Sequence, residues 1–210
     1  MDNRTTPLAV VALVSRVVTK VVDRVTTDRV SSPLLVAAAC VEALKLHKIK
    51  SRVMYGHAAW IEVLSDHSLI WAGCWGENLH FWVETEYGER VDLNSSQAHR
   101  KKPDDRPELS AIYSPPMLWT NEAPTFFRYR PIGIAAAEPD DESGKKQLDL
   151  VLREIREKCG PEQLGSGEPE FANEAILCPG RKILDDSLQS FQHYDRALSV
   201  RGIPEAPEFE

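Results

Sequence analysis

The sequence predicts an α+β protein in which a buried helix precedes an antiparallel sheet and further helices follow. Three observations support this fold class. Residues 33–47 are apolar on almost every side, which is typical of a buried helix. Residues 51–94 hold short apolar and aromatic segments separated by polar turns, the pattern of antiparallel strands. Helical periodicity returns in KQLDLVLREIREKC and at 180–199, so helices are expected after the sheet.

Two helices are expected before the sheet. Valines recur at helical spacing over residues 7–26, and Pro7 suits a first helical turn. Because β-branched residues lower helix propensity, packing must hold this helix. The second helix, residues 33–47, has a start signal at Ser32 and Pro33, since a serine hydroxyl caps free N–H groups and proline fits the first helical position.

The strands are expected after the second helix. Residues 51–64 predict a strand, and HSLIWAGCW at 67–75 predicts a further strand or a loop. LHFWVET and ERVDLN then form a hairpin that turns at Tyr87 and Gly88. The aromatic segment 126–134 predicts one or two more strands. Its rings either cap the sheet, which we favour, or line a cleft.

The chain is predicted to hold one main domain with an appended part. The expected divisions are an α+β domain at 1–137, a polar linker at 138–146 and a helical C-terminal extension at 147–210. Within the extension, KQLDLVLREIREKC predicts a helix and residues 180–199 predict another. The tail PEAPEFE is expected to be frayed, and the charged segment 96–108 is expected to be a surface loop.

Composition limits the classes of partner. A net charge of −7 and a pI near 5.4 argue against the broad basic surface that binds nucleic acid, so no nucleic-acid partner is expected. Ser15, Arg16 and Lys20 interrupt the first apolar run before the roughly 20 residues that a membrane span needs, so no membrane partner is expected. Four cysteines without C-x-x-C spacing favour reduced thiols and a cytoplasmic protein.

No metal site or cofactor is expected. His57, His67, His80 and His99 are scattered, with no H-x-x-x-H spacing and no thiol pair. The glycine-rich motifs of dinucleotide and phosphate binding and the G-x-S-x-G nucleophile motif do not occur. Nucleotide cofactors and α/β-hydrolase chemistry are therefore set aside.

HFWVETEYGERVDLN, residues 80–94, carries the strongest chemical signal. His80 opens one strand, and Asp92 ends the partner strand 12 residues later. The hairpin is expected to place them opposite each other on one face. A carboxylate there fixes the tautomer of a histidine and favours its imidazolium, as a general base for a thiol or hydroxyl requires. The same residues also suit an ordinary hydrogen-bonded hairpin, so both hypotheses stand.

Two segments, AAACVEALKLHKIKSRVMYG and LHFWVETEYGERVDLN, resemble the transglutaminase-like branch of the papain-like cysteine enzymes. The resemblance covers about residues 32–95. It implies a papain-like core in which His80 is the base and Asp92 orients it. It also implies attack on a carboxamide or peptide carbonyl of a protein or peptide, ending in hydrolysis, deamidation or acyl transfer to an amine.

The sequence departs from this family at the nucleophile. The family places a cysteine at the start of the central helix, where the helix dipole favours the thiolate, but Pro33 stands there in this chain. Ser32 is adjacent, although serine before proline is more often only a helix cap. Cys40 has the right chemistry but lies two turns into the helix, where a buried thiol acts as a small hydrophobe. Cys74, just before His80, would reverse the layout of the family and ranks third.

Two functions therefore stay open. The first is an enzyme, with candidate catalytic residues His80, Asp92, Cys40 and Ser32. The second is a degenerate member that has lost the nucleophile and binds a protein or peptide. An enzyme requires a sulfur or hydroxyl within reach of the His80 ring, about 5 Å at most.

Overall fold

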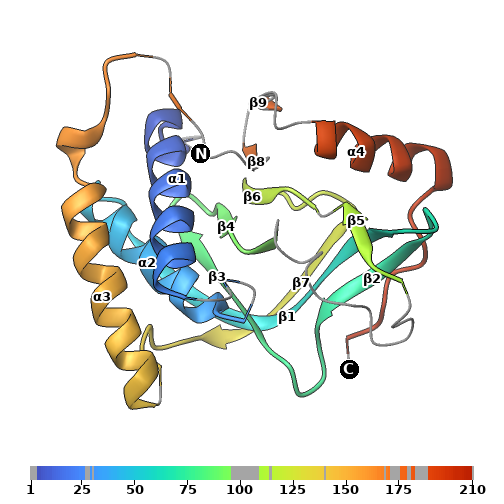
Figure 1. Cartoon of the computed structure of the whole chain (residues 1–210), viewed down its shortest axis with the longest axis horizontal. Coiled ribbons are helices and arrows are strands. Elements are labelled where there is room, and N and C mark those ends of the chain that lie inside the picture. Colours follow the sequence, from blue (N-terminus) through green and yellow to red (C-terminus); the bar gives the residue numbers. More distant parts are fainter. Residues whose placement is uncertain are drawn as a thin grey trace.

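The structure, a computed structural model, describes residues 4–26, 29, 31–95, 109–113, 115–139, 141–167, 169–170, 176–178, 181–182 and 189–209. Within these residues the chain is a mixed α+β fold, as predicted, with four α-helices around one curved, mostly antiparallel sheet (Figure 1). The elements are α1 (Leu8–Val25), α2 (Pro33–Leu46), β1 (Ser51–Leu64), β2 (Leu69–Cys74), β3 (His80–Thr85), β4 (Arg90–Asp92), β5 (Ala111–Tyr113), β6 (Met117–Thr120), β7 (Phe127–Ile134), α3 (Glu142–Lys158), the short 3₁₀ helix η2 (Pro161–Gln163), β8 (Ile176–Cys178), β9 (Arg181–Lys182) and α4 (Gln189–Arg201).

The long strand β1 is the centre of the sheet. One of its edges pairs first with β3 and then with β2, and the other edge pairs with β7 and β5. From β3 the sheet continues through β4, β6, β8 and β9, and among the described strands only the β6–β8 pair is parallel. Because β2 and β3 lie end to end on one edge of β1, the last residue of β2 and the first residue of β3 lie near each other at the middle of β1.

The main core lies between one face of the sheet and helices α1, α2 and α3. Alternating residues of β1, β3 and β4 face these helices, which Figure 1 shows grouped at one side of the molecule. Representative members of this core are Val14 and Val22 of α1, Ala39 and Ala43 of α2, Val53, Val83, Val91, and Val151 and Ile155 of α3. The valine stripe of α1 is buried as expected, since burial offsets the low helix propensity of valine. Helix α4 packs at the other end of the sheet, where Tyr194 and Leu198 cover Ile61 and Val63.

The helix boundaries agree with the sequence in the first half and differ in the second. Helices α1 and α2 fall within one residue of their predicted limits. Helix α3 begins at Glu142, inside the predicted linker 138–146, because the Asp141 side chain accepts a hydrogen bond from the backbone N–H of Gly144 at 2.8 Å and caps the helix early. The predicted helix at 180–199 is wrong at its start, since residues 181–182 pair with β8 as strand β9.

The C-terminal tail is ordered against the sheet, so the expectation of a frayed tail is wrong. The indole N–H of Trp71 donates to the carbonyl oxygen of Pro204 at 3.0 Å, and Arg130 donates to the carbonyl oxygen of Phe209. The predicted surface loop 96–108 lies outside the described residues. In the part of the chain that the structure describes, no helix has the length and apolar character needed to cross a membrane.

Candidate active site

His80 and Asp92 lie on the face of the sheet that turns away from α1, α2 and α3. Because Phe81 and Val83 pack toward the helices, the alternate residues of β3 point to the opposite side. We call this side the inner face. It is formed by Ala58, Trp60, His80, Trp82, Asp92, Leu118, Phe127 and Tyr129.

The two residues form a buried pair. Nε2 of His80 lies 2.7 Å from Oδ2 of Asp92, and each residue is 2% exposed. The strands pair Val83 with Val91, so Asp92 stands opposite Trp82 rather than opposite His80. The predicted pairing is therefore confirmed as a contact, but across a diagonal. The cause is the turn at 86–88, in which Gly88 adopts a left-handed φ of 76°.

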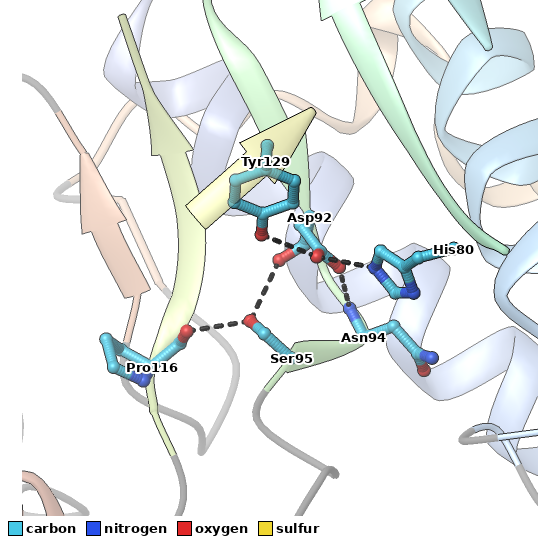
Figure 2. A network of polar contacts seen from close by, with 6 residues as sticks. All are labelled: His80, Asp92, Asn94, Ser95, Pro116 and Tyr129. Atoms are coloured by element: carbon cyan, nitrogen blue, oxygen red, sulfur yellow. Dashed lines mark hydrogen bonds and ion pairs between the residues drawn. The ribbon is translucent and has the colours of Figure 1, made fainter. Parts of the chain in front are cut away.

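Asp92 is held from three further directions (Figure 2). The hydroxyl of Tyr129 donates to Oδ2 at 2.8 Å, and the backbone N–H of Asn94 donates to Oδ1 at 3.0 Å. The Ser95 hydroxyl donates to the carbonyl oxygens of Pro116, at 2.8 Å, and of Asp92, at 3.3 Å. The carboxylate is thus fixed by groups from β3, β7 and the segment after β4, which compensates a buried negative charge.

Aromatic rings surround the pair. The Trp60 ring meets the His80 ring edge to face at 5.6 Å between centroids, and Trp82 stacks on the other side at 6.4 Å. Tyr129 packs against Trp82, and the Arg90 guanidinium lies 4.5 Å above the Tyr129 ring. These rings exclude water from the His80–Asp92 contact and strengthen its electrostatics.

The environment fixes the charge states of the pair. Burial by itself lowers the pKa of His80, but the charge and hydrogen bond of Asp92, aided by Cys74, outweigh it and raise the pKa to about 10. Burial by itself raises the pKa of Asp92, but His80, Tyr129 and the Asn94 N–H together hold that pKa below its usual value. Burial, followed by Asp92, raises the pKa of Tyr129 well above its ordinary range, so Tyr129 stays a neutral donor. At neutral pH the pair is an imidazolium and a carboxylate.

The structure brings Cys74 to His80. Cys74 ends β2 opposite Ala58, and His80 begins β3 opposite Gly56 on the same edge of β1. Paired residues share a face, so both side chains point to the inner face, two residues apart along β1. The half-buried Cys74 thiol interacts with the imidazole and contributes to its raised pKa. The exposed segment 75–79 leaves the sheet between them and returns.

The candidates that ranked above Cys74 lie elsewhere. Cys40 is 1% exposed in the helical core, and burial, followed by Cys159, raises its pKa far above the usual value. Ser32 occupies the N-cap position of α2, but its side chain makes no cap hydrogen bond there. Among the described residues, no hydrogen bond joins the His80 ring to Ser32 or Cys40.

Sequence reasoning missed the role of Tyr129. It grouped this residue with aromatic residues that cap the sheet, whereas the hydroxyl of Tyr129 binds Asp92. No local spacing predicts this contact, because the two residues are 37 positions apart on strands that do not pair with each other. The aromatic pattern of residues 126–134 predicts strand there, but it does not identify a partner for the Tyr129 hydroxyl. Within the described residues, no group of three or more His, Cys, Asp or Glu side chains is arranged to hold a metal ion.

Comparisons with known proteins add little to this geometry. No family model matches the chain, and no curated protein matches it. A crystal structure described as a genomics target is similar in backbone, with 17% sequence identity and a TM-score of 0.46, over 77% of this chain and 84% of that one. A likeness at this level carries no argument about family or function.

Proposed function

We propose that the protein is a cysteine-type enzyme that acts on amide or peptide bonds, with Cys74 as nucleophile, His80 as acid and base, and Asp92 as the residue that orients His80. The observation that carries this proposal is one buried imidazolium with a carboxylate on one side and a thiol beside it. A cationic neighbour favours the thiolate, which is the reactive form of cysteine. Asp92 is itself held by Tyr129, so the imidazole keeps one orientation.

The proposed reaction forms and breaks two bonds to the acyl carbon. The Cys74 thiolate attacks the carbonyl carbon, and the C–N bond breaks as the His80 imidazolium gives its proton to the departing amine. Water or a second amine then attacks the thioester and gives its proton to His80, which releases the acyl group and restores the thiolate. Backbone N–H groups of the turn that begins at Trp75 follow the nucleophile directly and are candidates to bind the oxyanion.

This reaction class is the one implied by the resemblance to transglutaminase-like enzymes. We propose that α2 and the sheet are a variant of the papain-like core in which the nucleophile has moved from the start of the helix to the end of a strand. Pro33 at the first position of α2 favours that view, because the family places its cysteine there.

The alternative function is a protein- or peptide-binding module without catalysis. The observation that favours it is the depth of the pair, since His80 is only 2% exposed. A buried imidazolium bound to a carboxylate also serves as a structural crosslink between strands.

Alkylation by iodoacetamide, followed by mass spectrometric mapping, separates the two functions. If the proposal holds, Cys74 is alkylated at pH 7 at least about tenfold faster than glutathione, and His80→Gln lowers that rate at least about tenfold. Cys74→Ala abolishes the labelling. Incorporation of a fluorescent primary amine into casein, or release of ammonia from it, then reports acyl chemistry by the wild type.

Two variants serve as controls. His67→Gln changes an exposed histidine in the turn between β1 and β2, and Cys40→Ala removes a thiol from the helical core, so neither should slow labelling of Cys74. An unreactive Cys74, or a rate that does not depend on His80, rules out the enzyme and leaves the binding module.

A further inference from the structure

The C-terminal tail lies on the side of the sheet opposite the inner face, across β2, β1 and β7. We call this side the outer face. Trp71 stands opposite Ile61 of β1, and Arg130 of β7 stands opposite His57 of β1. Ile61 and His57 are four residues apart on β1, so these side chains all point to the outer face. Figure 1 shows the chain descending from α4 beside β2 and ending near the connection between β2 and β3. We call the surface formed by Trp71, Trp75, His57 and Arg130 the tail site.

The tail site contacts an extended segment in the way that a receptor binds a peptide. Two side-chain donors, the Trp71 indole and the Arg130 guanidinium, bind backbone carbonyl oxygens of Pro204 and Phe209. The Phe209 ring is held edge to face by His57, at 5.6 Å between centroids, and lies 6.4 Å from the ring of Trp75. Backbone recognition combined with an aromatic anchor is a common mode of peptide binding.

A polar atom of the tail site is left without a partner. His57 is 6% exposed, and its Nδ1 is buried with no hydrogen-bond partner in the described part of the chain. The Phe209 ring that covers this imidazole offers no conventional acceptor. An unpaired buried polar group is unfavourable, so a ligand that places a hydrogen-bonding group here gains a contact that the tail does not make.

The charges of the surface and of its occupant are complementary. Arg128 and Arg130 are exposed on β7, and the tail carries Glu205 and Glu208, both exposed. Between Trp71 and His57, Gly73 of β2 pairs with Ala59 of β1. Both residues are small, so no large side chain stands at the centre of the surface.

From these contacts we infer that the tail site is a docking site for an acidic, extended peptide segment with an aromatic anchor, supplied by a partner protein and competing with residues 203–209 of this chain. Docking needs no reaction at Cys74, so the inference stands or fails separately from the proposed function. The tail site is also separate in space from the His80–Asp92 pair, because that pair lies on the inner face of the sheet.

Fluorescence polarisation with the full chain tests this inference. The probe is a labelled, amidated peptide with the sequence of residues 203–209, and the key variant is Phe209→Ala, which removes the internal anchor. A tail that is docked about 90% of the time raises the apparent Kd of a competing peptide about tenfold, so Phe209→Ala should bind the probe about five- to tenfold more tightly than the wild type. Val200→Ala, at an exposed site on α4, should bind like the wild type.

Two further measurements locate the peptide. In the Phe209→Ala background, Arg130→Ala should weaken binding at least about fivefold, and a probe with both glutamates changed to lysine should bind at least about fivefold more weakly. The inference is overturned if Phe209→Ala binds no better than the wild type, if neither binds, or if Arg130→Ala has no effect.

Discussion

At the scale of single residues, the candidate site shows how a buried ion pair is maintained. His80 and Asp92 are each almost fully buried, which would favour the neutral forms of both side chains. Their mutual contact, with donors from Tyr129 and Asn94, reverses that preference. The cost of burying either charge alone is therefore expected to appear when its partner is removed.

The pH dependence of stability tests this balance. The pKa of His80 is raised to about 10 from an ordinary 6.5, so its stabilising contribution is complete below about pH 6.5 and is lost as the pH rises toward 10. Asp92 has a lowered pKa, so its contribution is present above its ordinary pKa of 3.8 and is lost in stronger acid. Urea unfolding of the wild type should show a fall in free energy above pH 6.5, with a slope approaching about 1.4 kcal/mol per pH unit.

Asp92→Asn supplies the comparison. Burial, the largest single influence on the pKa of His80, is then opposed only by Cys74. We therefore expect the pKa to fall below its ordinary value, so that the folded state binds fewer protons than the unfolded state near pH 6. The stability of this variant should rise as the pH increases through 6.5, opposite in sign to the wild type. Parallel curves for the two proteins would show that the pair is not charged.

The sequence predicted part of this site because that part is local. His80 and Asp92 belong to one hairpin, so their spacing about the turn predicts that they lie close together. In the structure Asp92 stands opposite Trp82, two residues from His80, and reaches His80 diagonally. Cys74 ranked last because the resemblance directed attention to the start of α2. The fact that β2 and β3 share an edge of β1 is a tertiary pairing that no local pattern shows. The contact of Tyr129 with Asp92 was missed for the same reason.

At the scale of elements, the geometry of the β2 end places the thiol. Gly73 precedes Cys74 and adopts a φ of 150°, a conformation that side-chain-bearing residues rarely adopt. A Cβ at this position would also meet the carbonyl oxygen of Ala58 well inside contact distance. The close approach of β2 to β1, which sets the position of Cys74, therefore requires glycine.

Gly73→Ala and Gly76→Ala form a matched pair that tests this requirement. Gly76 also has a positive φ, of 66°, but a Cβ there meets nothing within 4 Å. Gly76→Ala should cost about 1–2 kcal/mol of unfolding free energy, the ordinary cost of a left-handed residue. Gly73→Ala should cost about 3 kcal/mol or more, because the strands must separate. Equal losses in chemical denaturation would mean that the contact with Ala58 is not tight.

Local signals predicted some elements better than others. Helix α2 begins at Pro33, and α1 follows its valine stripe, since these signals lie within the helices themselves. Strand β9 was missed because its two residues, Arg181 and Lys182, are strand only through pairing with β8. The tail was expected to fray because it is terminal, but Trp71 and Arg130, distant in sequence, bind it.

At the scale of the whole molecule, the helical part after the predicted linker shares the core of the rest. Val151 and Ile155 of α3 are fully buried among residues of α1, α2 and the sheet, and Leu148 packs against Leu35 and Ala38. A shared core couples the stability of its parts, so α3 and the sheet are expected to unfold together. Helix α2 contacts both α3 and β3 in this core, so its packing on the sheet also depends on α3.

Ile155→Ala and Leu150→Ala test this coupling on one helix. Ile155 is 0% exposed, so its truncation should cost about 2–5 kcal/mol, whereas Leu150, at 42% exposed, should cost less than about 1 kcal/mol. Helicity from circular dichroism and tryptophan fluorescence, which reports the buried Trp119 among others, should give coincident transitions in both variants. If α3 were an independent unit, Ile155→Ala would shift the helical transition to lower denaturant and leave the fluorescence transition of the sheet where the wild type has it. Coincidence in that variant means that a contact made by α3 stabilises the same folded state that holds His80 against Asp92.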